Sequence, residues 1–182
     1  MEDNDGDLEF NPAERIIRLT GEISEETSEK FIQNLHSVAE TPGEIVVIIH
    51  SDGGGLEDGF RIIDAMSVAK IKGCPIHTVV AGKAYSMGAY IACCGDRRTA
   101  YEHARIMFHS GRYDGSDGTL TKKELKQMYG EMMAFDIMLS NILRSVGVKE
   151  DMIDRMMSSD VYMGPDEAKA LGIIQDIERE VI

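Results

Sequence analysis

The 182-residue sequence predicts an α/β fold in a single domain. Two observations carry this prediction. Short runs rich in β-branched residues alternate with longer segments whose apolar residues recur every three or four positions, and polar or glycine-rich loops follow several of the short runs. The hydrophobic content of 43% is enough for a substantial core. Because the sequence has neither an internal repeat nor a sign of a second domain, we expect one domain over residues 15–182.

The N-terminal segment differs in composition from the rest of the chain. Residues 1–9 are polar and charged and contain few apolar groups. Such a segment buries too little apolar surface to offset its loss of conformational entropy. We therefore expect residues 1–14 to form a flexible acidic tail, with no core residue before Arg15.

The first half of the chain alternates between predicted strands and helices. A helix start is marked by Ser24, whose side chain can cap the first turn, and by the acidic residues that follow it. A glycine-proline break precedes the third strand. The predicted elements are a strand at Arg15–Leu19, a helix at Ser24–Ala39, a strand at Glu44–Ile49, a loop at Ser51–Gly55, a helix through Leu56 and Met66, and a strand at Ile76–Ala81.

The second half is expected to be mostly helical. The segment Lys122–Val146 has apolar residues at helical spacing, and Gly147 follows where a helix would end. The 12 methionines, many of them in this half, suggest either an adaptable surface or ordinary core and subunit contacts, and their spacing favours the second. The remaining elements are a helix at Ala89–Cys94, a strand at Ala104–Phe108, a polar loop at Gly111–Gly118, and helices at Val148–Met157 and Gly164–Leu171.

Composition excludes several classes of function. The formal charge of −13 argues against binding to nucleic acid or to an anionic membrane, since both partners require a basic face. Neither a signal peptide nor a membrane-spanning run is recognisable. The three cysteines, Cys74, Cys93 and Cys94, lack the spacing of a zinc site or a disulfide framework. We expect a cytoplasmic protein without a metal or cofactor.

A small-residue turn at Gly82–Ala89 is the most informative local pattern. It follows the predicted strand at Ile76–Ala81, precedes a predicted helix and presents one hydroxyl, that of Ser86. One interpretation is a turn needed only for close packing. The other is a nucleophile turn, in which glycines allow a sharply bent backbone and the free N–H groups of the first helical turn stabilise an oxyanion.

Three polar sites follow three separate predicted strands. These are the Ser51–Gly55 loop, Ser86 and His109. Because sites in open α/β sheets assemble at the carboxyl ends of strands, the three sites are expected to meet. Serine needs an imidazole to accept its proton, and a carboxylate to orient that imidazole. The amides of the Gly53-Gly54 loop and of Met87 would then serve as oxyanion donors, each contributing about 3 kcal/mol.

The sequence alone leaves the partners of Ser86 partly open. Among the five histidines, His109 is favoured because it stands at the end of a strand. A serine–lysine dyad with Lys83 is a minor alternative. Periodicity does not select the carboxylate from five candidates, which are Asp151, Asp154, Asp160, Asp166 and Asp176.

The whole set of motifs resembles the proteolytic subunit of the Clp protease over roughly residues 15–177. The resemblance implies a fold related to crotonase, with stacked β-sheets, flanking helices and a protruding long helix. By position it implies that Ser86 is the nucleophile, His109 the general base and Asp160 the orienting carboxylate, with the Gly54 and Met87 amides as the oxyanion hole. The motifs that carry it are residues 15–23, 51–54, 82–89, 105–109 and 160–163, followed by Glu167-Ala168 and Leu171–Ile174.

The resemblance also implies an assembly and its partners. Seven subunits would form a ring, two rings would stack into a chamber through the long helix, and an ATP-driven unfoldase of the AAA+ class would feed in unfolded protein or peptide substrates. This sequence itself has no phosphate-binding loop. It departs from the usual family pattern at Asp52, where proline is usual, at Ser110-Gly111, where glutamine-proline is usual, and at Gln175, where aspartate is usual. The family's axial segment is not recognisable in residues 1–14, so a divergent or phage-encoded member fits the sequence.

Two alternative functions remain open at this stage. One is an acyl-CoA enzyme of the crotonase type, because two glycine loops can also bind a thioester enolate. The other is a non-catalytic ring subunit whose triad is present but misaligned. The acyl-CoA enzyme would bind CoA, which a peptidase does not require. The non-catalytic ring subunit would not cleave peptides.

Overall fold

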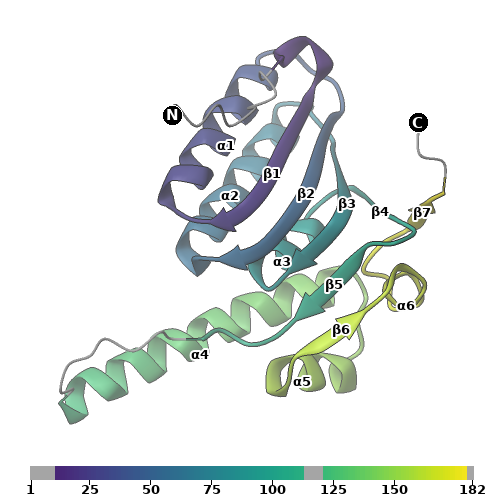
Figure 1. Ribbon diagram of the computed structural model, residues 1–182. Helices are drawn as coiled ribbons and strands as arrows, with labels where there is room; N and C mark the ends of the chain where they lie inside the picture. Colours follow the sequence, from purple (N-terminus) through teal and green to yellow (C-terminus); the bar gives the residue numbers. More distant parts are fainter. Residues whose placement is uncertain (1–10, 113–120, 180–182) are drawn as a thin grey trace, which may run out of the picture.

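The computed structural model describes residues 11–112 and 121–179, and it confirms the α/β fold (Figure 1). Residues 113–118 of the expected polar loop and most of the expected tail therefore fall outside the described residues. In chain order the elements are β1 (Ile16–Ile23), α1 (Glu25–Val38), β2 (Ile45–Gly54), α2 (Leu56–Ile71), β3 (Ile76–Tyr85), α3 (Met87–Cys93), β4 (Arg97–Tyr101), β5 (Arg105–Phe108), α4 (Lys122–Ser145), α5 (Glu150–Ser158), β6 (Val161–Met163), α6 (Pro165–Ala170) and β7 (Asp176–Glu178).

The strands form one hydrogen-bonded network with a branch. The main path runs β1-β2-β3-β4-β7, and every pair along it is parallel. β4 pairs with the first half of β3, and β5 pairs with the end of the same strand. β6 then pairs antiparallel with β5. In this way β5 and β6 leave the main sheet close to the point where β3 ends.

Three helices lie along one face of the sheet. α1 contacts α2, α2 contacts α3, and α3 packs on β2 and β3 (Figure 1). The expected cap of α1 is confirmed, since Ser24 and Thr27 form a reciprocal capping box. Phe31 and Leu35 of α1 are buried in the same core as β1, β2 and β3. Burying each of these side chains contributes about 1.5–3 kcal/mol to folding.

The observed elements extend beyond several predicted boundaries. β2 continues to Gly54, inside the expected loop at 51–55, and β3 continues through Gly82–Tyr85, because these polar and glycine residues still pair with the neighbouring strands. Helix α3 begins at Met87, two residues before the expected start. At the N-terminus, Pro12–Glu14 form a 3-10 turn, so ordered structure begins before the expected boundary at Arg15.

Helix α4 is half packed and half projecting. Its C-terminal half buries Leu139 and Leu143, whereas its N-terminal half extends away from the body of the molecule (Figure 1). Apolar side chains at every fourth position from Leu125 to Ile137 are exposed, with 52% of Leu125, 67% of Tyr129, 45% of Met133 and 56% of Ile137 accessible. We refer to these four residues as the α4 stripe. In the parts of the chain that the structure describes, no helix has the length and apolar character needed to cross a membrane.

Candidate active site

Ser86 is the single residue between β3 and α3. Its backbone has φ 50° and ψ −128°, a conformation that residues other than glycine rarely adopt. Such a residue costs about 1–3 kcal/mol and is kept only when its surroundings fix it. Here the Ser86 N–H donates to the Met107 carbonyl (2.9 Å), and the Ser86 carbonyl accepts from the Ala89 N–H (2.9 Å). The strained turn is therefore held by β5 on one side and by α3 on the other.

The glycine loop at the end of β2 packs directly against this turn. A methyl carbon placed on Gly53 would lie 2.6 Å from Cβ of Ser86 and 3.1 Å from the amide nitrogen of Met87. Buried Ser51 supports the loop, because its hydroxyl donates to the Gly21 carbonyl (2.6 Å) and accepts from the Gly53 N–H (3.0 Å). Only glycine allows the two backbone segments to approach this closely.

The two expected oxyanion donors are the backbone amides of Gly54 and Met87. The Met87 N–H belongs to the first turn of α3, where amides have no partner within the helix. The bond to β1 uses the Gly55 N–H, which donates to the Ile23 carbonyl (2.7 Å). Since successive amides of a strand point to opposite sides, the Gly54 N–H points away from β1. Gly54 and Ser86 line the same cavity, and Met87 directly follows Ser86.

His109 follows β5. The contact of its Nδ1 shows which ring nitrogen carries the proton. Its Nδ1 lies against the Ser110 carbonyl, which can only accept, so Nδ1 carries the proton. In the neutral ring Nε2 is then an acceptor, as a general base requires. The His109 carbonyl accepts from the hydroxyl of buried Tyr90 (2.9 Å). Burial raises the pKa of Tyr90, so this hydroxyl remains a donor at neutral pH.

Asp160 is brought beside His109 by strand register. Phe108 of β5 pairs with Val161 of β6 in antiparallel sense, so the next residues, His109 and Asp160, stand opposite each other. The Asp160 carboxylate nevertheless accepts a hydrogen bond from the Arg112 guanidinium. This bond holds the pKa of Asp160 below its usual value, and the nearby His109 adds a smaller effect in the same direction.

Ser86, His109 and Gly54 line one cavity of about 670 Å³, whereas Asp160 lies outside the lining. The lining of the cavity includes both apolar residues and carboxylates. The apolar lining residues are Leu56, Tyr90, Met128, Met132, Phe135 and Leu139. The acidic ones are Glu22, Asp52, Glu57, Asp58 and Glu131.

Other residues that could have served as the base for Ser86 bond to groups elsewhere in the structure. Lys83 binds both carboxylate oxygens of Asp52 (2.7 Å each), so its ammonium group is engaged away from Ser86. Buried His77 contacts the Thr99 hydroxyl (2.9 Å), and burial lowers the pKa of His77. His50 contacts the Ala81 carbonyl (2.7 Å). None of these three residues lines the cavity that contains Ser86.

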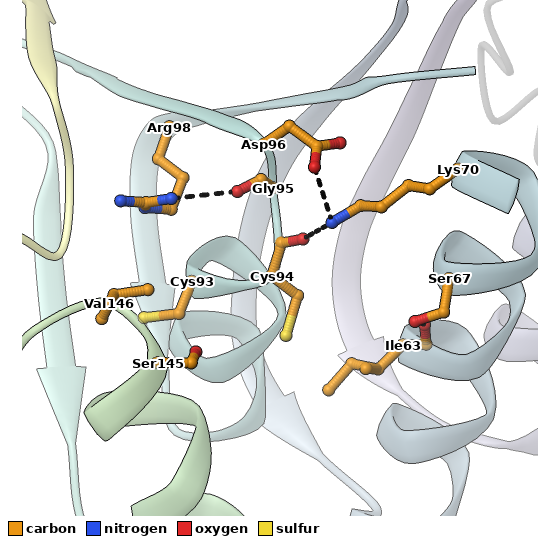
Figure 2. Close-up of a pocket in the computed structure, with 10 residues that line it drawn as sticks. All are labelled: Ile63, Ser67, Lys70, Cys93, Cys94, Gly95, Asp96, Arg98, Ser145 and Val146. Atoms are coloured by element: carbon orange, nitrogen blue, oxygen red, sulfur yellow. Dashed lines mark hydrogen bonds and ion pairs between the residues drawn. The ribbon is translucent and has the colours of Figure 1, made fainter. Parts of the chain in front are cut away.

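A second cavity, of about 440 Å³, lies between α2, α3 and the end of α4 (Figure 2). Its polar groups bind one another: the Lys70 ammonium donates to the Cys94 carbonyl (2.6 Å) and pairs with Asp96 (3.3 Å). Burial raises the pKa of Cys94 to about 11 and also raises the pKa of Cys93. Both thiols are therefore protonated at neutral pH and are poor nucleophiles. This cavity offers no catalytic group comparable to Ser86.

Sequence reasoning missed three residues that shape the site. Tyr90 holds the His109 carbonyl, Arg112 binds Asp160, and the Asp136 carboxylate accepts from the Gly111 N–H (3.0 Å). Tyr90 and Asp136 belong to helical segments with ordinary periodicity, and Arg112 stands at the start of a polar loop. No sequence signal of their roles was present. Within the described residues, no cluster of three or more metal-ligating side chains is found.

Comparison with known families agrees with the fold. A family model described as Clp protease matches residues 9–181, almost the entire chain. Members of that family are serine-type peptidases and usually form oligomeric rings with unfoldase partners. The chain therefore belongs to the Clp protease family.

Proposed function

We propose that this protein is a self-compartmentalising serine endopeptidase that cleaves unfolded polypeptides. Ser86 is the nucleophile, His109 the general base, Asp160 the carboxylate that orients it, and the Gly54 and Met87 amides the oxyanion hole. The observation that carries this proposal is the strained backbone of Ser86 at the start of α3, in one cavity with His109 and Gly54. A strained strand-to-helix serine is typical of a nucleophile.

The chemistry proceeds in two balanced steps. His109 Nε2 accepts the hydroxyl proton as the Ser86 oxygen attacks the scissile carbonyl, and the carbonyl oxygen becomes an oxyanion held by the two amides. The C–N bond then breaks, and His109 returns the proton to the leaving amine, which leaves an ester on Ser86. Water, deprotonated by His109, hydrolyses that ester and regenerates the serine.

The direct test is covalent labelling with a fluorophosphonate probe. We expect one adduct per chain, located on Ser86 by peptide mass spectrometry, together with cleavage of a fluorogenic peptide. Ser67→Ala is a matched control, because the exposed Ser67 hydroxyl bonds only within its own helix (3.0 Å to the Ile63 carbonyl). Assembled protein that neither labels nor cleaves would favour a non-catalytic ring subunit. CoA binding without labelling would favour the acyl-CoA alternative.

We further propose that the α4 stripe is buried against a second copy of the chain in a heptameric ring or in a stack of two rings. Four exposed apolar side chains on one helix face are more than an isolated monomer usually presents. A closed chamber of this kind excludes folded proteins, so an ATP-driven unfoldase is the partner that would supply extended substrate.

Met133→Glu tests the role of the stripe in assembly. A carboxylate in an apolar interface loses its hydration without gaining a partner, so we expect a smaller assembly by light scattering and sedimentation. The fold of each chain should persist by circular dichroism, because Met133 is 45% exposed in the single chain.

Gln127→Glu is the matched control for charge. Gln127 is exposed, and its position falls on the opposite side of α4 from the stripe, where it bonds only to Glu131 (3.1 Å). It should leave the native mass unchanged. If Met133→Glu also kept that mass, the stripe would not be the interface.

A further inference from the structure

The segment from Ser110 to Arg112 contacts two members of the proposed triad, His109 and Asp160. The His109 Nδ1–H donates to the Ser110 carbonyl, and the Arg112 guanidinium donates to the Asp160 carboxylate. In the catalytic arrangement that same Nδ1–H would instead donate to Asp160. In this structure His109 and Asp160 therefore each bond to this segment rather than to each other. Strand register nevertheless places the two residues opposite each other.

The same segment is fastened to the body of the protein at two points. The Tyr90 hydroxyl of α3 donates to the His109 carbonyl (2.9 Å), and the Gly111 N–H donates to Asp136 of α4 (3.0 Å). The second bond uses the backbone N–H of Gly111, which a proline at this position would lack. The segment is thus fastened to both α3 and α4.

Two hydrogen-bond donors, the Arg112 guanidinium and the Nδ1–H of His109, compete for the Asp160 carboxylate. The Arg112 hydrogen bond and charge dominate the lowering of the Asp160 pKa, and His109 acts in the same direction. The carboxylate is therefore ionised at neutral pH and attracts either partner. Both members of the ion pair are exposed, with side-chain accessibilities of 62% for Arg112 and 40% for Asp160. Solvent screening makes such a pair weak and reversible.

We propose that Arg112 is a positioning residue that restrains catalysis by holding Asp160 away from the His109 imidazole. The inference rests on the proposed peptidase function. Full activity requires the carboxylate to exchange the guanidinium for the Nδ1–H of His109, which at the same time releases the Ser110 carbonyl. Asp136 favours the restrained state, because it anchors the backbone between Ser110 and Arg112 to α4.

Arg112→Gln is the primary test, with Arg112→Lys as the conservative variant. Removal of the positive charge should raise the rate constant of fluorophosphonate labelling and kcat for a neutral peptide by about two- to fivefold, the range expected of an exposed ion pair. KM should not change. Arg112→Lys keeps the charge and should remain nearer to wild type. If Arg112 instead bound substrate from the cavity wall, Arg112→Gln would raise KM without raising kcat.

A double-mutant cycle shows whether the effect acts through Asp160. In an Asp160→Asn background the carboxylate is absent, so Arg112→Gln should no longer accelerate labelling. Native mass and circular dichroism establish that the variants are folded and assembled. An unchanged or slower rate in Arg112→Gln, or an acceleration that persists in the Asp160→Asn background, would overturn the proposal.

Ionic strength provides a second measurement on the unmodified protein. Salt screens an exposed ion pair, so wild-type labelling should accelerate between about 0.05 and 0.5 M NaCl at constant native mass. A flat response would count against the restraint even if Arg112→Gln did not fold. The two proposals fail differently. If Ser86 never labels, the peptidase assignment fails and the restraint with it, whereas labelling that is indifferent to Arg112 and to salt refutes only the restraint.

Discussion

Replacement of Ser86 by alanine is expected to lower kcat for peptide cleavage by a factor on the order of 10⁶, the loss that follows removal of an activated serine nucleophile. The thermal midpoint and the native mass should hardly change. Within the described part of the chain, the hydrogen bonds of Ser86 are made by its backbone, and alanine retains the same backbone groups. Steady-state kinetics with a fluorogenic peptide and light scattering on the same sample provide the measurements.

The controls for this variant separate chemistry from structure. Ser67→Ala makes the same chemical change on α2 and should keep wild-type kcat, since Ser67 lies outside the cavity with Ser86. Retention of cleavage by Ser86→Ala would show that another group is the nucleophile. Loss of cleavage together with loss of assembly would point instead to a structural role of the strained turn.

Much of the fold follows from local sequence patterns. The helix at α1 was predictable because Ser24, its acidic first turn and its apolar period agree with one another. The junction at Ser86 was predictable because a β-branched run meets glycines and then a helical segment. Where local signals agreed in this way, the structure confirms the elements.

Short or polar strands were not predictable from such patterns. β4, β6 and β7 have three to five residues each, too few to show a period, and they exist because neighbouring strands pair with them. The ends of β2 and β3 contain glycine and polar residues, which are typical of loops. Tertiary pairing outweighs this local preference.

The contacts within the site depend on residues distant in sequence. Arg112 and Asp160 are separated by 48 positions, and Gly111 and Asp136 by 25. No periodicity relates such pairs, and in an acidic chain most carboxylates are solvated. A family resemblance suggests that Asp160 belongs with His109, but only the folded arrangement shows that Arg112 binds Asp160.

Gly54→Ala is expected to damage both stability and catalysis. Gly54 has φ 148°, and a methyl carbon there would lie 2.1 Å from the Ile23 carbonyl oxygen and 2.7 Å from the Ile23 nitrogen. These are backbone atoms of β1, so the strand itself would have to shift. Overpacking of this kind costs about 1–3 kcal/mol. The displaced loop would also move an oxyanion donor, which lowers kcat by about 10²–10³-fold.

Gly147→Ala is the matched control, because Gly147 also has a positive φ, 91°, but no atom lies within 4 Å of an added methyl carbon. Gly147→Ala should lower the free energy of unfolding only by the cost of the backbone conformation, about 1 kcal/mol, and kcat should not change. Urea unfolding at one fixed protein concentration and peptide kinetics measure the two effects. If Gly54→Ala were no more destabilised than Gly147→Ala and cleaved peptide normally, the loop would be less confined than the structure indicates. If Gly54→Ala were instead strongly destabilised but cleaved peptide normally, the Gly54 amide would not be an oxyanion donor, and Met87 would be left to stabilise the intermediate alone.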